Sequence, residues 1–139
     1  MGTNQKIEVR YYTKTGNTKK LAEAVAKTAG VTAKTVDHPV NGDVDILFLG
    51  SSVYAAGVDN SVKDFINTLS PSVKKVVNFS TAALLPSTYA QVKKLLTAKG
   101  ISVDEKEFHC RGSFKFMHKG KPDDNDLQAV QKFVKELIK

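Results

Sequence analysis

Cysteine is scarce in this sequence, and long apolar runs are missing altogether. Cys110 is the single cysteine, so the chain cannot form an internal disulfide, and one free thiol is typical of a reducing compartment. A membrane-spanning helix needs about 20 consecutive apolar residues, and no run approaches that length. Met1–Lys6 also lacks the apolar centre of a secretory signal. These absences predict a cytoplasmic protein that does not enter the membrane.

Arginine is also scarce, although the chain is strongly basic. The formal net charge is +7, and Arg10 and Arg111 are the only arginines. Recognition of phosphates and base edges usually depends on arginine, and the lysines are scattered along the sequence. We therefore expect no nucleic-acid partner. A positive net charge is better suited to acidic protein partners.

Several motifs that would indicate other chemistries are missing. The sequence has neither the G-x-x-x-x-G-K-[ST] loop of nucleotide-triphosphate sites nor the G-x-G-x-x-G fingerprint of dinucleotide sites. His38, His109 and His118 lack the spacing of metal ligands. Ser51 and Ser52 are outside the G-x-S-x-G context of a catalytic serine. We therefore predict no metal site and no catalytic residue.

What the sequence does contain is a hydroxyl-rich loop, Thr13–Thr18, between the β-prone run Ile7–Tyr12 and a helical pattern that starts at Lys19. The first turn of a helix presents unpaired backbone N–H groups and the positive end of the helix dipole, so it can bind a phosphate. Gly16 can adopt positive φ there. Thr and Asn are also favoured at helix starts for purely local reasons. The loop alone is therefore compatible with a phosphate site or with a simple helix cap.

Strand and helix patterns alternate along the chain. The expected strands are Ile7–Tyr12, Val31–Val36, Asp45–Gly50, Val73–Ser80 and a segment within Ile101–His109. Apolar residues at helical spacing follow four of these strands, around residues 21–29, 62–69, 88–99 and 127–138. The continuous apolar run Asp45–Gly50 is typical of a strand buried on both faces. The pattern predicts one α/β domain over residues 1–139, with a five-stranded parallel sheet and helices on both faces.

Ligands of such sheets bind beyond the carboxyl ends of the strands. Four loops are expected at that end: the loop at Thr13, two loops of small residues that begin at Ser51 and at Thr81, and the long loop Cys110–Asn125. Their shared position favours the phosphate site over the simple cap.

The chain resembles a flavodoxin of the short-chain type. Thr13–Thr18 matches the phosphate loop of that family, and Gly50–Tyr54 resembles its first flavin-flanking loop. Cys110–Pro122 and Asp126–Leu127 are similar to its C-terminal part. The resemblance implies a three-layer α/β sandwich with strand order 2-1-3-4-5 and non-covalently bound FMN. Flavodoxins are themselves an example of ligand binding where the winding of the sheet reverses.

By this resemblance, three groups of residues would bind the cofactor. The FMN phosphate would be held by Thr13, Lys14, Thr15, Gly16, Asn17 and Thr18. One face of the isoalloxazine would be flanked by Ser51, Ser52, Val53, Tyr54, Ala55, Ala56 and Gly57. The other face would be flanked by Thr81, Ala82, Ala83 and Leu84. Tyr54 would be the ring that stacks on the flavin.

Two features depart from the best-known members of the family. Their second flanking loop often carries a stacking aromatic and acidic residues, whereas here it is small and aliphatic. The second flavin face would therefore be open, or covered by Phe114, Phe116 or a partner. This chain is also basic, with Lys14 in the phosphate loop and Arg111 in the last loop. Because positive charge stabilises an anion, we expect the anionic reduced flavin to be less disfavoured than in acidic relatives.

The resemblance implies electron transfer as the function, with a reductase and an acceptor enzyme as redox partners and a monomeric protein. Two alternatives stay open. The chain could be an FMN-dependent reductase, or the flavin subunit of one, that acts on a small organic substrate. It could also be an interaction module that keeps the fold without the flavin.

Overall fold

The structure, a computed structural model, describes residues 6–13, 16–40, 42–53, 59–82, 89–111 and 122–138. In these ranges the elements are β1 (Ile7–Tyr11), α1 (Asn17–Ala29), β2 (Ala33–Thr35), β3 (Ile46–Val53), α2 (Asn60–Thr68), β4 (Val76–Ala82), α3 (Tyr89–Thr97), β5 (Phe108–Arg111) and α4 (Asp124–Leu137). The five described strands form one parallel sheet in the order β2-β1-β3-β4-β5. The predicted α/β fold and its strand order are confirmed.

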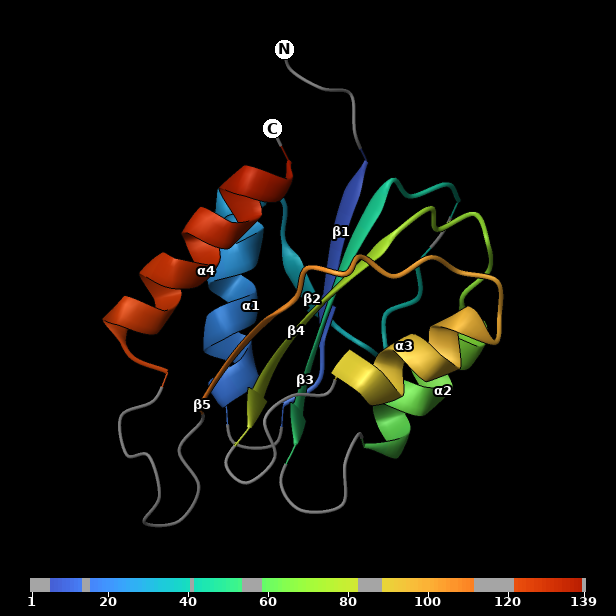
Figure 1. Cartoon of the computed structure of the whole chain (residues 1–139), viewed down its shortest axis with the longest axis horizontal. Coiled ribbons are helices and arrows are strands. Elements are labelled where there is room, and N and C mark those ends of the chain that lie inside the picture. The colour runs from blue at the N-terminus through green and yellow to red at the C-terminus, as the bar shows by residue number, and fades with distance from the viewer. Residues whose placement is uncertain are drawn as a thin grey trace.

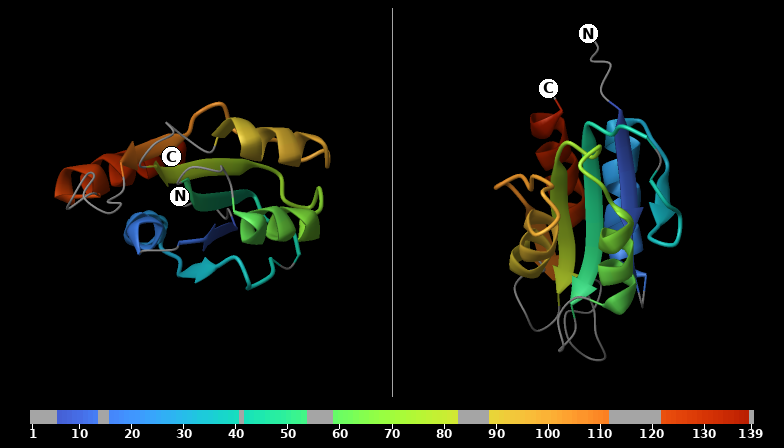
Figure 2. Two further views of the ribbon diagram at one scale, coloured as in Figure 1. Left: turned by 90° about the horizontal axis from the view of Figure 1, so that it is seen from below. Right: turned by 90° about the vertical axis from the view of Figure 1, so that its right-hand side faces the viewer.

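Helices cover both faces of the sheet, as Figure 1 and the end-on view of Figure 2 show: α1 and α4 lie on one face, and α2 and α3 lie on the other. The central strand β3 serves both layers. Ile46 and Phe48 pack in the cluster with α1 and α4, while Leu47 and Leu49 pack in the cluster with α2 and α3. Side chains alternate across a strand, so burial on both faces requires the continuous apolar run seen in the sequence. Each such side chain stabilises the fold by about 1.5–3 kcal/mol.

Two strands extend further at their carboxyl ends than the sequence predicted, and β4 also begins at Val76 instead of Val73. β3 continues through Ser51–Val53 and β4 through Thr81–Ala82, segments that were expected to be loops. The parallel register runs on to the pair formed by Val53 and Ala82. Because each of these strands is held along its length by the other, small polar residues remain in the sheet despite their weak intrinsic preference for strands.

The edge strands also differ from their predicted bounds. β5 extends to Arg111, so Cys110 and Arg111 belong to a strand and not to the expected loop. Residues 101–107 lie outside β5, apart from one isolated bridge between Val103 and Val76. β2 is shorter than expected but occupies the predicted edge of the sheet. An edge strand has a neighbour on one side only, so less pairing fixes its ends.

Candidate functional site

The start of α1 is built as an open N-terminus. Gly16 precedes the helix with φ of 90°, in the left-handed region, where glycine carries no Cβ penalty. Its N–H donates to Oγ1 of Thr13 at 2.9 Å, which fixes the turn from β1 into the helix. In the described part of this turn, no side chain caps the first turn and no acidic residue lies in it. Asn17 and Thr18 are nevertheless buried, at 4% and 0% exposure.

Two other helix starts, those of α2 and α4, are closed by aspartate. In α2, Oδ1 of Asp59 accepts from the N–H of Ser61 at 2.9 Å. In α4, Asp123 and Asp126 form a reciprocal capping box. A carboxylate at these positions satisfies the first-turn N–H groups and repels an anion. Of these three helices, α1 alone is arranged to receive an anion from outside the chain.

The carboxyl ends of β3 and β4 bring further polar groups to the start of α1. Ser51 in β3 pairs in register with Ser80 in β4, and both are fully buried. Thr81 is 2% exposed, and its Oγ1 lies 2.8 Å from Oγ1 of Thr18. Thr18 and Thr81 are 63 residues apart in the sequence, so this contact joins the start of α1 directly to the end of β4.

A close approach between β3 and β4 lies immediately before these polar ends. Gly50 faces the ring of Phe79, its register partner. A Cβ added at Gly50 would come within 2.3 Å of Cε2 and 2.4 Å of Cζ of that ring. Only glycine therefore leaves room for the buried Phe79 ring beside β3. The site residue Ser51 directly follows this constrained position.

The structure places each predicted site residue that it describes at one end of the sheet. Thr13, Gly16, Asn17 and Thr18 surround the start of α1. Backbone positions 51–53 and 81–82 lie at the carboxyl ends of β3 and β4, as strand residues where loops were expected. Lys14, Thr15, Tyr54, Ala55, Ala56, Gly57, Ala83 and Leu84 lie outside the described residues. The assignment of all these residues to a cofactor stays a prediction.

Ser80 is a polar residue of this region that sequence reasoning did not select. It is fully buried one position before Thr81, and it was expected as an ordinary strand residue. Its signal in the sequence is weak, because one serine at the end of an apolar run is common. Its parallel register opposite Ser51 becomes apparent only once the two strands are paired.

Charges near the start of α1 are basic. Lys19 and Lys20 follow the buried residues of the first turn and are exposed, where positive charge would attract an anionic ligand over a short range. No group of His, Cys, Asp or Glu within the described ranges could hold a metal ion. None of the helices in those ranges is long and apolar enough to cross a membrane.

Comparison with known proteins identifies the family. Residues 8–117 match the model of the flavodoxin domain, and the chain belongs to this family. An uncharacterized protein of Methanocaldococcus jannaschii is 26% identical over 137 residues, which cover 88% of this chain and 91% of that protein.

Solved structures share the fold. A flavodoxin from the domain Archaea superimposes with a TM-score of 0.80 at 20% identity, over 96% of both chains. Oxidised Flavodoxin 1 from Bacillus cereus gives a TM-score of 0.74 at 17% identity, over 96% of this chain and 97% of that one. Rubredoxin oxygen:oxidoreductase from Desulfovibrio gigas gives 0.71 at 14% identity, over 94% of this chain but only 34% of its own.

Membership of the flavodoxin domain family implies that the chain binds a flavin. The residues present fit the phosphate end of such a ligand. The open start of α1 supplies N–H donors and the positive end of a helix dipole, and hydroxyl groups of Thr13 and Thr18 stand beside it.

Proposed function

We propose that the protein binds FMN non-covalently and carries electrons between a reductase and an acceptor enzyme. The observation that supports this most directly is the uncapped start of α1, with Asn17 and Thr18 buried at the end of the sheet where flavodoxin-type folds bind their ligand. When bound, the flavin supplies the one- and two-electron redox chemistry. The residues of the chain bind and orient it.

In this proposal the phosphate lies on the start of α1. Thr13, Gly16, Asn17 and Thr18 hold it together with Lys14 and Thr15, which the sequence places in the same loop. The isoalloxazine would be flanked by residues 51–57 on one face and by residues 81–84 on the other, and Tyr54 would supply the stacking ring. The phosphate contacts rely on backbone N–H groups, so they need no metal ion.

The first experiment compares FMN with riboflavin, which lacks the phosphate. Purified apo-protein is titrated with each flavin while flavin fluorescence is measured. A phosphate held by several charge-assisted hydrogen bonds of about 1.5–3 kcal/mol each predicts that FMN binds at least about 100-fold more tightly than riboflavin. Equal affinities would exclude a phosphate site at α1. Absence of binding by either flavin would favour the flavin-free interaction module instead.

The role as a carrier is tested separately from flavin binding. We expect the FMN-loaded protein to oxidise NAD(P)H at a negligible rate by itself, and to be reduced rapidly when a flavodoxin reductase is added. Stepwise reduction followed by absorbance would show whether the bound flavin is reduced in one-electron steps. Rapid NADPH or NADH oxidation by the isolated protein would favour the alternative, an FMN-dependent reductase.

One observation supports the alternative of an FMN-dependent reductase. The same fold forms about a third of rubredoxin oxygen:oxidoreductase from Desulfovibrio gigas, so a domain of this shape can also stand within a larger oxidoreductase. In that case the chain would serve as the flavin subunit of an enzyme acting on a small substrate. Co-purification of the chain with a second subunit that raises its NAD(P)H oxidation rate would support this reading.

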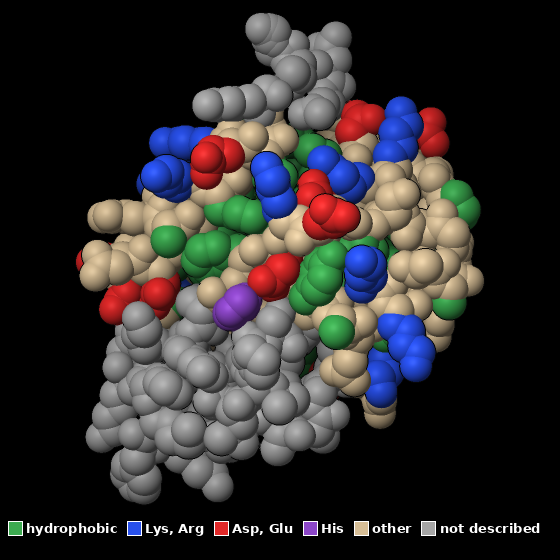
Figure 3. Space-filling view, viewed as in Figure 1, with side chains coloured by type: hydrophobic (Ala, Val, Ile, Leu, Met, Phe, Trp, Pro, Cys, Tyr) green, Lys and Arg blue, Asp and Glu red, His purple; other side chains and the backbone are tan. Residues whose placement is uncertain are grey.

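We further propose that the redox partners are acidic and that the protein acts as a cytoplasmic monomer. The net charge of +7 supports electrostatic attraction to an acidic partner. Figure 3 shows basic and acidic side chains interspersed on the face that carries β5, α3 and α4, so no single basic patch dominates that face. Electron-transfer rates should fall as salt is raised from about 0.05 to 0.5 M, and size-exclusion chromatography would test the monomer.

The basic charge also bears on the potential of the flavin. Lys19 and Lys20 are exposed beside the start of α1, the sequence places Lys14 in the adjoining loop, and Arg111 is the last residue of β5. Positive charge near the cofactor stabilises the anionic hydroquinone, so its midpoint potential should be less negative than in acidic flavodoxins and should fall as salt is added. A potential as negative as theirs, and insensitive to salt, would contradict this.

A further inference from the structure

A cavity of about 580 Å³ lies on the α2 side of the sheet, where β1 and β2 end. It is separate from the buried polar residues at the ends of β3 and β4. It is lined by Tyr11, Tyr12, Thr13, Thr35, Val36, Asp37, Ser61, Asp64, Phe65 and Thr68. Its volume falls within the range of about 300–1,000 Å³ that is typical of small-molecule sites.

Two walls of the cavity come from different elements. One wall is the carboxyl end of β1 and the segment that leaves β2, and the other is one side of α2 from Ser61 to Thr68. Tyr11 and Phe65 are nearly fully buried and supply aromatic surface, and Tyr12 adds a third ring. The hydroxyl groups of the lining threonines and of Ser61 supply hydrogen-bonding positions.

Both charged residues among the described residues of the lining are acidic. Asp37 stands on the wall beside β2, and Asp64 stands on α2. No lysine, arginine or histidine is among the described residues that line the cavity, although the chain as a whole carries a net charge of +7. The lining therefore combines two carboxylates with aromatic surface, a combination that attracts cations by charge and by cation–π contact.

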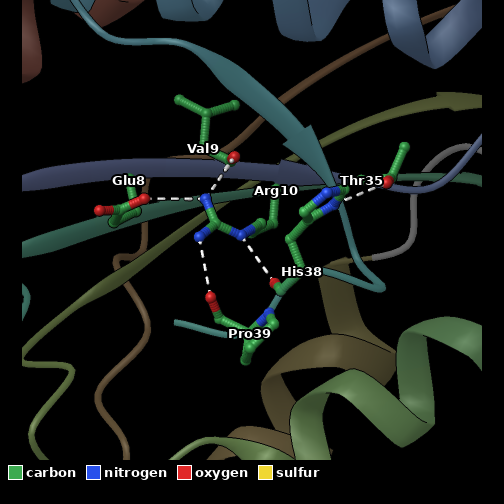
Figure 4. Close-up of polar contacts among 6 residues, drawn as sticks. All are labelled: Glu8, Val9, Arg10, Thr35, His38 and Pro39. Atoms are coloured by element: carbon green, nitrogen blue, oxygen red, sulfur yellow. Dashed lines mark hydrogen bonds and ion pairs between the residues drawn. The ribbon is translucent and has the colours of Figure 1, made fainter. Parts of the chain in front are cut away.

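Arg10 holds the segment that directly follows Asp37, and Figure 4 shows its contacts with His38 and Pro39. Arg10, which is 3% exposed, donates from Nε to the carbonyl of His38 at 2.9 Å and from Nη2 to the carbonyl of Pro39 at 3.0 Å. Its Nη1 forms an ion pair with Glu8 at 2.8 Å and donates to the carbonyl of Val9 at 3.1 Å. The buried guanidinium fixes the backbone directly after Asp37. This segment is therefore ordered before a ligand binds, and binding does not carry the entropy cost of ordering it.

The Asp37 carboxylate is itself kept ionised. It accepts a hydrogen bond from the Thr35 hydroxyl, and Nδ1 of His38 lies 3.3 Å from it. The hydrogen bond from Thr35 is the main cause that lowers the pKa of Asp37, and the neighbouring His38 acts in the same direction. Asp37 therefore presents a negative charge at any pH near neutrality.

We propose that this cavity binds a small organic cation: an ammonium or guanidinium group on a short alkyl stem. The stem packs on the Tyr11, Tyr12 and Phe65 rings, and the cationic ends face Asp37 and Asp64. The shared chemistry is an alkyl ammonium, which a free diamine or a lysine side chain could supply. The two carboxylates on separate walls favour the free diamine, which can pair with both.

The cavity adjoins the phosphate loop through Thr13, which lines both. A ligand in the cavity would therefore lie next to the first residue of the proposed flavin site. The proposal does not depend on flavin binding, because the described lining comes from residues 11–13, from residues 35–37 and from α2, and only Thr13 among these is assigned to the flavin site. Its test is run on the protein both with and without FMN.

The probe is 1,4-diaminobutane, titrated into ¹⁵N-labelled protein and followed by amide chemical shifts. We expect saturable shifts that concentrate at residues 35–37 and 61–68. The neutral isostere 1,4-butanediol should bind about tenfold more weakly, because it cannot form an ion pair with either of the two exposed carboxylates. Nα-acetyl-lysine methylamide, with one ammonium group, distinguishes a lysine side chain from a free diamine: tighter binding of this blocked lysine would overturn the choice of the diamine.

Two variants locate the site. Asp64→Asn removes an exposed helix carboxylate that no described fold contact requires, and we expect it to weaken the diamine about two- to fivefold, as for a partly exposed ion pair. Glu136→Gln makes the same charge change on the exposed surface of α4 and should leave the affinity unchanged. Equal weakening by both variants, or equal binding of the diamine and the diol, would overturn the proposal.

Discussion

Oγ1 of Thr18 and Oγ1 of Thr81 form a buried hydrogen bond of 2.8 Å. Thr18 is in the first turn of α1, and Thr81 is near the carboxyl end of β4. The bond therefore ties two of the three segments that the flavodoxin resemblance assigns to the cofactor. Because both hydroxyls are buried, neither can exchange its partner for bulk water.

The first prediction concerns this pair. Thr81→Val leaves the Thr18 hydroxyl buried without its partner and should lower the free energy of unfolding by about 1–3 kcal/mol. Thr18→Val should do the same, and the double variant should cost clearly less than the sum, because no hydroxyl is then left unpaired. Urea unfolding of the apo-proteins measures all three. Exposed Thr97→Val on α3 is the matched control and should change stability by less than about 0.5 kcal/mol.

The second prediction separates two proposed roles of Gly16: binding of the FMN phosphate, and the positive φ that the chain needs before α1. Gly16 and Gly30 flank the same helix, α1, and both have positive φ. In neither case does an added Cβ meet another atom within 4 Å. Gly16→Ala and Gly30→Ala should therefore have similar strain, about 1–2 kcal/mol each by urea unfolding.

Their effects on FMN should differ. Gly16 lies at the end of α1 that would receive the phosphate, so Gly16→Ala should weaken FMN at least about tenfold, which corresponds to 1.4 kcal/mol. Gly30→Ala should leave the affinity within about twofold, because it is at the opposite end of the helix. Equal FMN affinities in the two variants would argue against a phosphate on the start of α1.

The sequence was sufficient for the fold because local patterns and burial agree. The run Asp45–Gly50 is apolar at every position after its first residue, as a strand between two helix layers must be, and β3 has side chains in both core clusters. Regular spacing at Leu127, Val130 and Val134 likewise predicted α4, whose buried residues are Val130 and Val134. The order of the strands came from the family resemblance, since no local pattern contains it.

The sequence does not predict features that depend on contacts between segments far apart in the chain. Ser51–Val53 looks like a loop because small polar residues have weak strand preference, yet pairing with β4 keeps it in the sheet. The contact between Thr18 and Thr81 spans 63 positions and leaves no local signal. The cavity beside Asp37 also depends on how β2 and α2 approach each other, which no spacing along the chain contains.

The third prediction tests the close approach at Gly50. Gly50→Ala places a methyl group far closer to the Phe79 ring than van der Waals contact allows. Overpacking of this kind costs about 1–3 kcal/mol. Phe79→Leu destabilises by itself through a loss of buried volume. The double variant should be less destabilised than the sum of the two, because leucine leaves room for the new methyl group. Strict additivity in urea unfolding would show that the ring is not what excludes a side chain at position 50.

The fourth prediction is a loss of stability in acid. Burial alone would raise the pKa of Asp104, but the N–H of Lys106 at 2.9 Å and the ammonium group of Lys75 at 3.1 Å lower it below its usual value. The backbone N–H of Lys6, at 2.8 Å, lowers the pKa of Asp45. A carboxyl with a lower pKa in the folded state stabilises the fold fully above its unfolded pKa of about 3.9 and loses that contribution as the pH falls through the folded value.

Urea midpoints should therefore fall between about pH 5 and pH 2, and Asp104→Asn should flatten that fall. At pH 7 this variant should be less stable than the parent, and the difference should shrink as the pH approaches 2. Asp64→Asn, at an exposed position on α2, is the matched control and should follow the parent curve. A constant difference between Asp104→Asn and the parent at all pH values would show that the carboxylate charge is not responsible.

The fifth prediction concerns Arg10, whose buried guanidinium binds the carbonyl groups of His38 and Pro39 and the carboxylate of Glu8. Arg10→Met removes these contacts together with the hydrogen bond to the carbonyl of Val9 at 3.1 Å. The carbonyl groups and Glu8 then lose this partner, so the free energy of unfolding should fall by about 3–5 kcal/mol. Glu8→Gln keeps the carbonyl contacts and should cost much less. Arg10→Lys keeps the charge but not the planar array of donors, and should fall between them. Amide hydrogen exchange at residues 36–40 should accelerate in the same order; a large effect of Glu8→Gln and a small one of Arg10→Lys would show that the ion pair, and not the carbonyl contacts, holds this segment.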